Sequence, residues 1–263
     1  MATTIQQIEL PKKARAVDTS GNNNHGQIYS GRGLEFDGIG DYLTGPTSFP
    51  HSDVTIALWV NQNSDSGYRG LVSRSSGGAA SANWSLWWNN GKPVIFIGHS
   101  SGGSGYLDIT ANTKLENNVW YRLVCTVDFS SKTGKIYING ILDKTHTWTE
   151  SHLTDSDAIL IGSLTPSANF WDGMLSDAQI WNKSFTQADI TYDYLNPESL
   201  ALNNSGTTLT ESNLKLWYPM QDGHRGQQSY ILDGANTGLG VELAICGDFE
   251  CASPLTGWTV NAS

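Results

Sequence analysis

The chain has 263 residues and a formal net charge of −10, and only 15% of its residues are charged. This negative charge repels polyphosphates, and no run of Lys or Arg offsets it locally, so nucleic acid is not expected as a partner. No apolar stretch reaches the roughly 18 residues of a membrane span, and residues 1–17 lack the apolar core of a secretory signal. With 28 Gly, 10 Trp and 10 Tyr, the composition favours aromatic-rich strands joined by small-residue turns over a helix bundle.

Short apolar or alternating runs, separated by turn residues, follow one another from residue 33 onward. This pattern predicts an all-β sandwich. The expected strands cover residues 33–36, 42–44, 54–61, 70–73, 84–88, 94–98, 106–110, 120–128, 135–138, 159–161 and 173–181. Asn89-Asn90-Gly91 and Asn139-Gly140 tolerate a positive φ, so each predicts a hairpin turn.

One helix is expected, from Thr186 to Tyr194, after the last of these strands. Thr186 can cap its first turn, and Asp189 stands three residues later, where it complements the exposed N–H groups.

The chain changes character beyond Asn196, where a polar stretch leads to the apolar segment LKLWYPM at 214–220. The final segment is too short to bury a core alone, so it must dock on the main domain or on another chain. The expected division is an N-terminal arm (1–15), a jelly-roll sandwich (16–195), a linker with a docking strand (196–241), and an assembly segment or the start of a further β domain (242–263).

The three cysteines do not suggest a disulfide framework, because their number is odd. Cys125 lies in an apolar run, and Cys246 and Cys251 lie close together without the further His or Cys that a zinc site needs. Free thiols are expected, with a small disulfide loop between Cys246 and Cys251 as the alternative.

Several ordered motifs carry a resemblance to a known family. The segments DTSGNNNHG at 18–26 and LEFDGIGDY at 34–42 resemble the opening of laminin-G-like, concanavalin-A-like domains. TIALWV at 55–60, the pair WYRLVCTVD and GKIYINGIL within 120–142, and FWDGMLSDAQIWNKSFTQADI at 170–190 follow in the family's order. The resemblance covers residues 16–192 and implies a two-sheet antiparallel jelly-roll sandwich, here with a C-terminal extension. It does not decide function, because this family includes glycan-binding modules, adhesion proteins, enzyme appendages and phage structural proteins.

The chain departs from the family at its start, which lacks the usual strand before the DTSGN turn; a segment of that kind, LKLWYPMQDG, stands instead at 214–223. The tail, with WYPM, then DGANTGLG, GDFE and GWT, resembles virion structural proteins of tailed phages, particularly those of marine hosts.

The resemblance also suggests a structural calcium site. In the family the Asn/Gly-rich turn that contains Asp18 meets the closing strand, where Asp177 occupies the matching acidic position. Two carboxylates and a loop carbonyl, here that of Asn23, would form the oxygen-only set that Ca²⁺ prefers. The alternative is that Asp18 forms an Asx-turn while Asp177 caps a strand end. Asp37 and Asp41 flank two glycines and are interpreted as a tight bend in preference to a second site.

Exposed aromatic rings are the expected means of binding a ligand, because a ring face stacks on a sugar at little entropic cost. Trp87 and Trp88 point to opposite faces of their strand, so at least one of them leaves the main core. With the adjacent 99–106 loop, this region is the expected ligand edge, against the alternative that the rings are core residues. The candidate ligand-binding residues are Trp87, Trp88, Tyr106, Trp148 and Trp171.

No catalytic motif is present: the sequence has no E-x-D-x-E strand, G-x-S-x-G elbow, H-E-x-x-H pair or phosphate loop, and its six histidines are scattered singly. We therefore expect a non-enzymatic protein.

Two functions remain open. The first is a phage virion structural protein, a capsid decoration or tail-fibre component located in the virion, with other virion proteins and further copies of itself as partners and host surface polysaccharide as a ligand. The second is a carbohydrate-binding or adhesion module, free-standing or attached to an enzyme. The apolar residues expected to serve assembly are Leu216, Trp217, Met220, Leu243 and Phe249, with 214–220 docking on its own sandwich.

Overall fold

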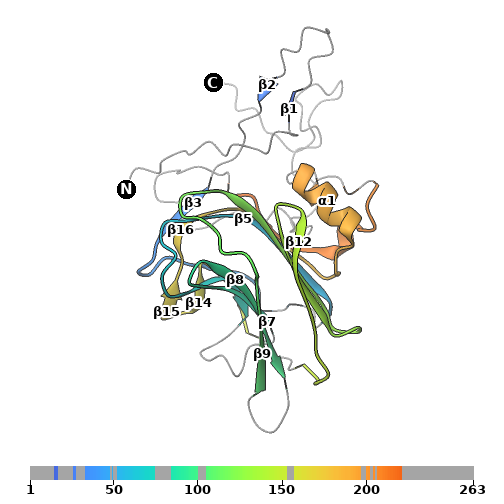
Figure 1. The fold of residues 1–263 in the computed structure, drawn as a ribbon, viewed down its shortest axis with the longest axis horizontal. Helices are drawn as coiled ribbons and strands as arrows, with labels where there is room; N and C mark the ends of the chain where they lie inside the picture. Colours follow the sequence, from blue (N-terminus) through green and yellow to red (C-terminus); the bar gives the residue numbers. More distant parts are fainter. Residues whose placement is uncertain are drawn as a thin grey trace, which may run out of the picture.

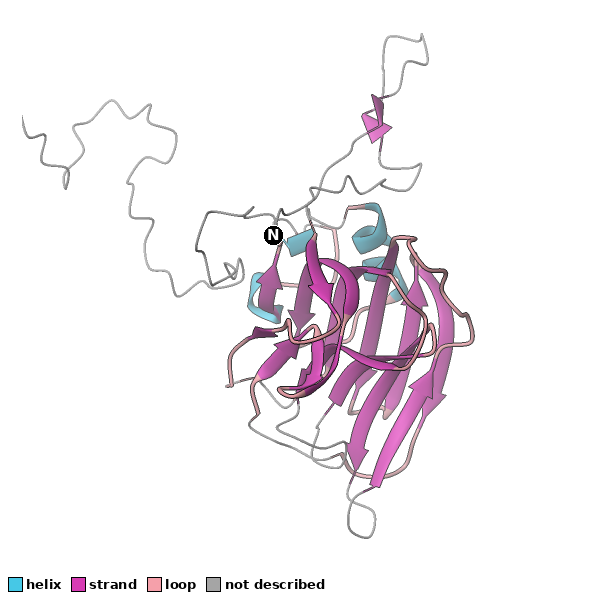
Figure 2. Cartoon of the chain, turned by 90° about the vertical axis from the view of Figure 1, so that its left-hand side faces the viewer, coloured by secondary structure: helices cyan, strands magenta, loops and turns pink. Residues whose placement is uncertain are grey.

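The computed structural model describes residues 15–16, 26–27, 33–47, 49, 52–74, 84–99, 105–152, 157–196, 200–201, 204 and 206–220. They form two antiparallel sheets packed face to face, the sandwich that the sequence predicts, and strands dominate this part of the chain (Figures 1 and 2). No helix within it is long and apolar enough to cross a membrane.

The larger sheet has seven described strands, two of which share one edge. Along the sheet the order is β12 (Ile141–Thr147), β11 (Thr133–Ile138), β10 (Tyr121–Asp128), β5 (Val54–Gln62), β16 (Asp172–Trp181) and β17 (Leu214–Tyr218). The first half of β16 pairs with β3 (Leu34–Asp37) and its second half with β17. The segment around 214–218 therefore completes the edge of its own sandwich, as the sequence led us to expect.

The smaller sheet has six described strands in the order β4 (Leu43–Thr44), β13 (Ile159–Ile161), β6 (Tyr68–Arg74), β7 (Trp84–Asn89), β8 (Lys92–His99) and β9 (Gly105–Thr110). Two further pairs are β1 (Arg15–Ala16) with β2 (Gly26–Gln27), and β14 (Ser163–Thr165) with β15 (Ala168–Phe170). β14 runs close over β6 at Gly70, where an added Cβ would lie 2.0 Å from the Leu164 nitrogen. Glycine is required there because backbone meets backbone.

Alternation along the strands builds the main core between the sheets. Ile56, Leu58 and Leu123 point inward from the larger sheet, and Leu86 and Ile97 from the smaller one; all five are buried in one cluster. Cys125 joins this core as a free thiol, while Cys246 and Cys251 lie outside the described residues.

The nine-residue helix α1 (Gln187–Leu195) covers the outer face of the larger sheet (Figure 1). The predicted cap is confirmed: the Thr186 side chain accepts from the Asp189 N–H, and the Asp189 carboxylate accepts from the Thr186 N–H. Ile190 packs into a second apolar cluster with Val124, Tyr137 and Trp181 on that face. A short 3-10 turn, Glu211–Asn213, leads into β17.

Both predicted hairpin turns are present. Asn90 and Gly91 have φ values of 49° and 85°, and Asn139 and Gly140 have values of 51° and 80°. The sequence-based prediction missed β1, β2, β12, β14 and β15. β12 is an exposed edge strand without apolar alternation, and the other four are two or three residues long.

Candidate functional site

Three of the five predicted ligand-binding aromatics are core residues, so the prediction is wrong for them. Trp88 and Trp171 are fully buried and meet edge to face at 5.2 Å between ring centroids. Trp148 is 8% exposed and packs edge-on against Phe129. The Trp88 Nε1–H donates to the Gln62 side-chain oxygen, so even its polar atom is satisfied inside the sandwich. These rings fill the core instead of offering a face to a ligand.

Trp87 and Tyr106 lie on the opposite, outer face of the smaller sheet. Trp88, next to Trp87, and Ile109, three residues after Tyr106, point into the core, and side chains alternate between the two faces. Trp87 is half-buried and Tyr106 is 56% exposed. The expectation that one of Trp87 and Trp88 leaves the core is therefore confirmed.

Two further rings, which sequence reasoning missed, join them in a line that we call the aromatic diagonal: Tyr68, Trp87, Phe96 and Tyr106. The register places Tyr68 opposite Asn89, Trp87 opposite Val94, Phe96 opposite Ser85, and Gly98 opposite Tyr106. Each ring thus lies one strand across and two residues along from the previous one, from β6 to β9. Diagonal neighbours of this kind are roughly 7–8 Å apart, so the line spans roughly 20 Å.

The rings of the aromatic diagonal form two stacked pairs. Tyr68 and Trp87 stack at 5.0 Å with 22° between their planes, and Phe96 and Tyr106 stack at 5.4 Å with the same angle. The outer rings are the exposed ones, with Tyr68 at 53% and Tyr106 at 56%, whereas Phe96 is only 4% exposed. The surface therefore presents flat ring area at both ends over a buried floor that also contains Val94 and Ser85.

Polar groups without partners lie beside these rings. Within the described part of the chain, the buried Trp87 Nε1 and Ser85 Oγ have no hydrogen-bond partner. Ser85 and Asp108 both lie opposite Phe96, on its two neighbouring strands, so the Asp108 carboxylate belongs to the same face. Asp108 is exposed, yet partial burial of its surroundings raises the pKa of its carboxyl.

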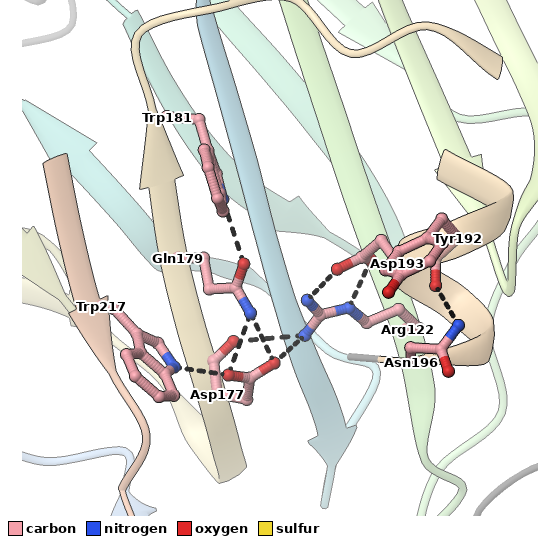
Figure 3. A network of polar contacts seen from close by, with 8 residues as sticks. All are labelled: Arg122, Asp177, Gln179, Trp181, Tyr192, Asp193, Asn196 and Trp217. Atoms are coloured by element: carbon pink, nitrogen blue, oxygen red, sulfur yellow. Dashed lines mark hydrogen bonds and ion pairs between the residues drawn. The ribbon is translucent and has the colours of Figure 1, made fainter. Parts of the chain in front are cut away.

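The outer face of the larger sheet contains a different kind of polar site, in which donors and acceptors are paired (Figure 3). Arg122 on β10 is fully buried. Its guanidinium donates to the Asp177 carboxylate at 2.8 Å and, through two nitrogens, to the Asp193 carboxylate of α1 at 2.7 and 2.8 Å. This buried ion pair fastens the helix to the sheet.

Asp177 lies at a bulge of β16, with a φ of 47°, between the stretches that pair with β3 and β17. Gln179 Nε2 and Trp217 Nε1 also donate to its carboxylate, at 2.9 and 2.7 Å. Burial raises the pKa of Asp177 to about 6, against the opposing effect of Arg122. Positive φ is costly for a non-glycine residue, and here hydrogen bonds from β10, from β17 and from Gln179 of the same strand hold Asp177 in place.

The predicted calcium site can be followed only at Asp177, because Asp18 and Asn23 lie outside the described residues. The Asp177 carboxylate already has a cationic partner in Arg122, so a Ca²⁺ ion there would lie beside a guanidinium. No cluster of three or more His, Cys, Asp or Glu suited to a metal occurs in the described ranges. The site stays a prediction, which a melting curve in chelator tests.

Asp37 and Asp41 form the tight bend that the sequence interpretation favoured. The Asp37 carboxylate accepts from the Ile39 N–H at 2.8 Å, and the Asp41 carboxylate accepts from the Asp37 N–H at 3.4 Å.

The predicted assembly residues on β17 and just after it are occupied within their own chain. Leu216, Trp217 and Met220 are 0%, 9% and 2% exposed, respectively. They stabilise the sandwich edge and are not presented to a partner. Leu243 and Phe249 lie outside the described residues, so their assembly role stays a prediction.

A two-sheet jelly roll with a ring-lined outer face defines a lectin-like β-sandwich. The chain belongs to the concanavalin A-like lectin/glucanase superfamily, whose Laminin_G_3 model matches residues 37–191. A search against curated proteins gave no match.

Solved structures resemble the chain at low sequence identity. A protein from Bacteroides ovatus, provisionally described as carbohydrate-binding, is 15% identical with a TM-score of 0.55; the match covers 83% of this chain and 61% of that one. A CBM40 domain of the Ruminococcus gnavus IT-sialidase is 15% identical with a TM-score of 0.49, covering 62% of this chain and 97% of that one. The receptor binding domain of botulinum neurotoxin D is 19% identical with a TM-score of 0.49, covering 74% and 53%. The chain thus spans about three fifths of the Bacteroides protein, and the likeness establishes the fold alone.

Proposed function

We propose that this chain is a non-catalytic carbohydrate-binding module that holds a polysaccharide against the aromatic diagonal. The observation that carries the proposal is the pair of ring stacks on one sheet face, with Tyr68 and Tyr106 more than half exposed. Ring faces held by a stacked neighbour lose little entropy when a sugar packs on them. The superfamily and the Bacteroides relative are consistent with such a role.

The arrangement of buried carboxylates supports a role in binding instead of turnover. Hydrolysis of a glycan needs two carboxyl groups that face the scissile bond from opposite sides. Asp177 and Asp193 instead share Arg122 beneath α1, where their oxygens accept hydrogen bonds from protein groups. They act as structural anions.

A glycan array followed by calorimetry tests this function. We expect weak binding to polysaccharides, and a loss of affinity of about fivefold or more when Trp87→Ala or Tyr106→Ala removes a ring, since stacking on an aromatic ring contributes about 1 kcal/mol. Tyr42→Ala is the matched control, because Tyr42 is also exposed and stacked, on Phe170, away from the diagonal. Equal losses in all three variants would contradict the location, and an array without any bound glycan would contradict the function.

A second candidate is a structural protein of a phage particle, a capsid decoration or tail-fibre component in the virion. The resemblance of the tail motifs from WYPM to GWT supports it. The two candidates are compatible, because an appendage of a particle can recognise a host surface polysaccharide. Mass spectrometry of purified virions tests this role, and absence of the chain from the particles would contradict it.

Association with other virion proteins or with further copies of the chain belongs to the same proposal. A variant that ends at residue 220 keeps β17 and removes the segment with Leu243 and Phe249. We expect it to keep its stability and lose association, as measured by light scattering. An unchanged mass distribution relative to the full chain would contradict the assembly role.

A further inference from the structure

The charge and hydrogen-bonding groups around the aromatic diagonal restrict the sugars that it can hold. We propose that the outer face of the smaller sheet selects neutral polysaccharides and rejects anionic ones, with Asp108 as the polar anchor for sugar hydroxyls. This inference rests on the proposed function and names the ligand class of the same surface.

Asp108 lies on β9, the edge strand of the smaller sheet. It follows Tyr106 by two residues on β9, so both side chains lie on the same face, and it is opposite Phe96 on β8. Tyr106 and Phe96 are a stacked pair. The carboxylate therefore lies beside the stacked rings on which a sugar would pack.

No protein cation neutralises this carboxylate in the described part of the chain. The only contribution that moves the Asp108 pKa is desolvation, which raises it. Sugar hydroxyls are hydrogen-bond donors, and a bond to an ionised acceptor is about twice as strong as a neutral one. A sulfate or carboxylate on the ligand would instead bring a second negative charge beside Asp108, against a chain whose net charge is already −10.

The cations on and near this face are engaged elsewhere. Lys92, at the Tyr68 end of the face, donates to the Asn112 carbonyl at 2.9 Å. Arg69 donates to the Phe170 carbonyl and pairs with Asp172, and Lys114 pairs with Asp65. None of these three cations pairs with Asp108.

Two further groups favour a hydroxylated ligand. Ser85 is 1% exposed and its Oγ has no partner among the described residues, and the same holds for the Trp87 Nε1. Both belong to β7, two residues apart on the face of the diagonal. An unsatisfied buried polar group costs free energy, and a sugar hydroxyl that reached these atoms would provide an acceptor for the indole N–H and a partner for the serine.

Affinity electrophoresis in native gels tests the inference. The probes are dextran, galactomannan and a β-glucan, each beside its sulfated derivative, at about 0.15 M salt, where exposed charges are partly screened. We expect the unmodified chain to be retarded by at least one neutral polymer and much less by the sulfated derivative of the same polymer. Retardation by the sulfated form that equals or exceeds that by the neutral form overturns the selectivity and leaves the proposed function standing. Absence of retardation by every polymer, with an empty glycan array, overturns both.

The variant Asp108→Asn removes the negative charge of this side chain and keeps its shape, so it tests whether the charge determines the choice of ligand. Asp108 is exposed, so the exchange is expected to preserve the fold. We expect its affinity for the neutral polymer to fall about tenfold, the loss for one charge-assisted hydrogen bond, and its discrimination against the sulfated polymer to shrink. Glu35→Gln, an exposed carboxylate on β3 of the larger sheet, is the matched control and leaves both unchanged. Equal behaviour of the two variants overturns the role of Asp108.

Discussion

The two outer faces of the sandwich differ in whether their buried polar groups have hydrogen-bond partners. On the larger sheet, α1 covers the strands, and Arg122, Asp177, Gln179 and Asp193 satisfy one another in a buried network. On the smaller sheet, exposed rings stand beside Ser85 and Trp87, whose polar atoms have no partner among the described residues. Complete pairing serves stability, because an orphaned buried group costs free energy. Unpaired groups beside exposed rings are consistent with the proposed binding of a ligand at this face, whereas the Trp148 and Trp171 Nε1 atoms also lack a partner but lie in the core.

Arg122→Met gives the largest expected effect and tests the buried polar network on the outer face of the larger sheet. It removes the shared cation and leaves the Asp177 and Asp193 carboxylates buried together, so the free energy of unfolding falls by about 3–5 kcal/mol. Urea denaturation measures it. Arg69→Met is the control, since its pair with Asp172 is partly solvent-exposed and its loss costs about 1 kcal/mol or less. Similar losses in the two variants would show that the network is not what fastens α1.

The neighbouring residues Trp87 and Trp88 on β7 allow the cost of replacing an outward and an inward side chain to be compared. Trp88→Ala leaves a cavity in the core and is expected to lower the free energy of unfolding by about 3 kcal/mol or more. Trp87→Ala loses only half-buried surface and one stacking contact with Tyr68, so about 1 kcal/mol is expected. Thermal and urea unfolding measure both. A Trp87 variant as unstable as the Trp88 variant would place Trp87 among the structural residues.

Acidification is expected to stabilise the folded state through the Asp177 carboxyl. The pKa of Asp177 is raised from its ordinary value of 3.8 to about 6, so the folded state takes up a proton before the unfolded state does. The stabilisation is fully present below the unfolded pKa and is lost as pH rises through about 6. Between about pH 7 and pH 5, wild type should gain about 1 kcal/mol relative to Asp177→Asn.

Urea curves at the two pH values check this difference. Burial opposes the ionised form of Asp189, but hydrogen bonds from Thr208 and Thr186 outweigh it and lower its pKa, so its contribution is lost only at more acidic pH. A gain of equal size in the Asp177→Asn variant would assign the effect to another group.

The smallest effect is expected at the helix cap. Thr186→Ala removes the side-chain acceptor for the Asp189 N–H and should cost about 1 kcal/mol, whereas Thr186→Ser keeps the hydroxyl and most of the stability. Thermal melts of the two variants measure it. Equal melting temperatures would show that packing alone holds α1.

The sequence predicts much of the fold because alternation and turn chemistry are local. Trp84, Leu86 and Trp88 recur at every second position of their strand and share the core, and the Asn139-Gly140 turn needs only its own two residues. The candidate site is harder to predict from the sequence, because its rings are brought together by the register of four strands. Trp87 and Tyr106 could be proposed from the sequence, but Tyr68 and Phe96 join them only through the pairing of β6 to β9. Trp171 and Trp148 were misplaced because an aromatic residue after a loop looks the same whether it turns inward or outward.

The Arg122 network was missed for a related reason. Arg122, Asp177 and Asp193 are spread over 72 residues of chain, and no spacing rule links them. A buried arginine within the apolar run of β10 is the one local signal, since an arginine there requires a carboxylate partner.

The most direct test of ligand binding at the aromatic diagonal is the indole N–H signal of Trp87 in a ¹H–¹⁵N spectrum, assigned with Trp87→Phe. This N–H has no partner within the described residues, whereas the Trp88 and Trp217 N–H groups donate to Gln62 and Asp177. Titration with a neutral polysaccharide that binds is predicted to shift the Trp87 signal and leave the Trp88 and Trp217 signals in place. Saturable binding that leaves the Trp87 signal unmoved would contradict the account.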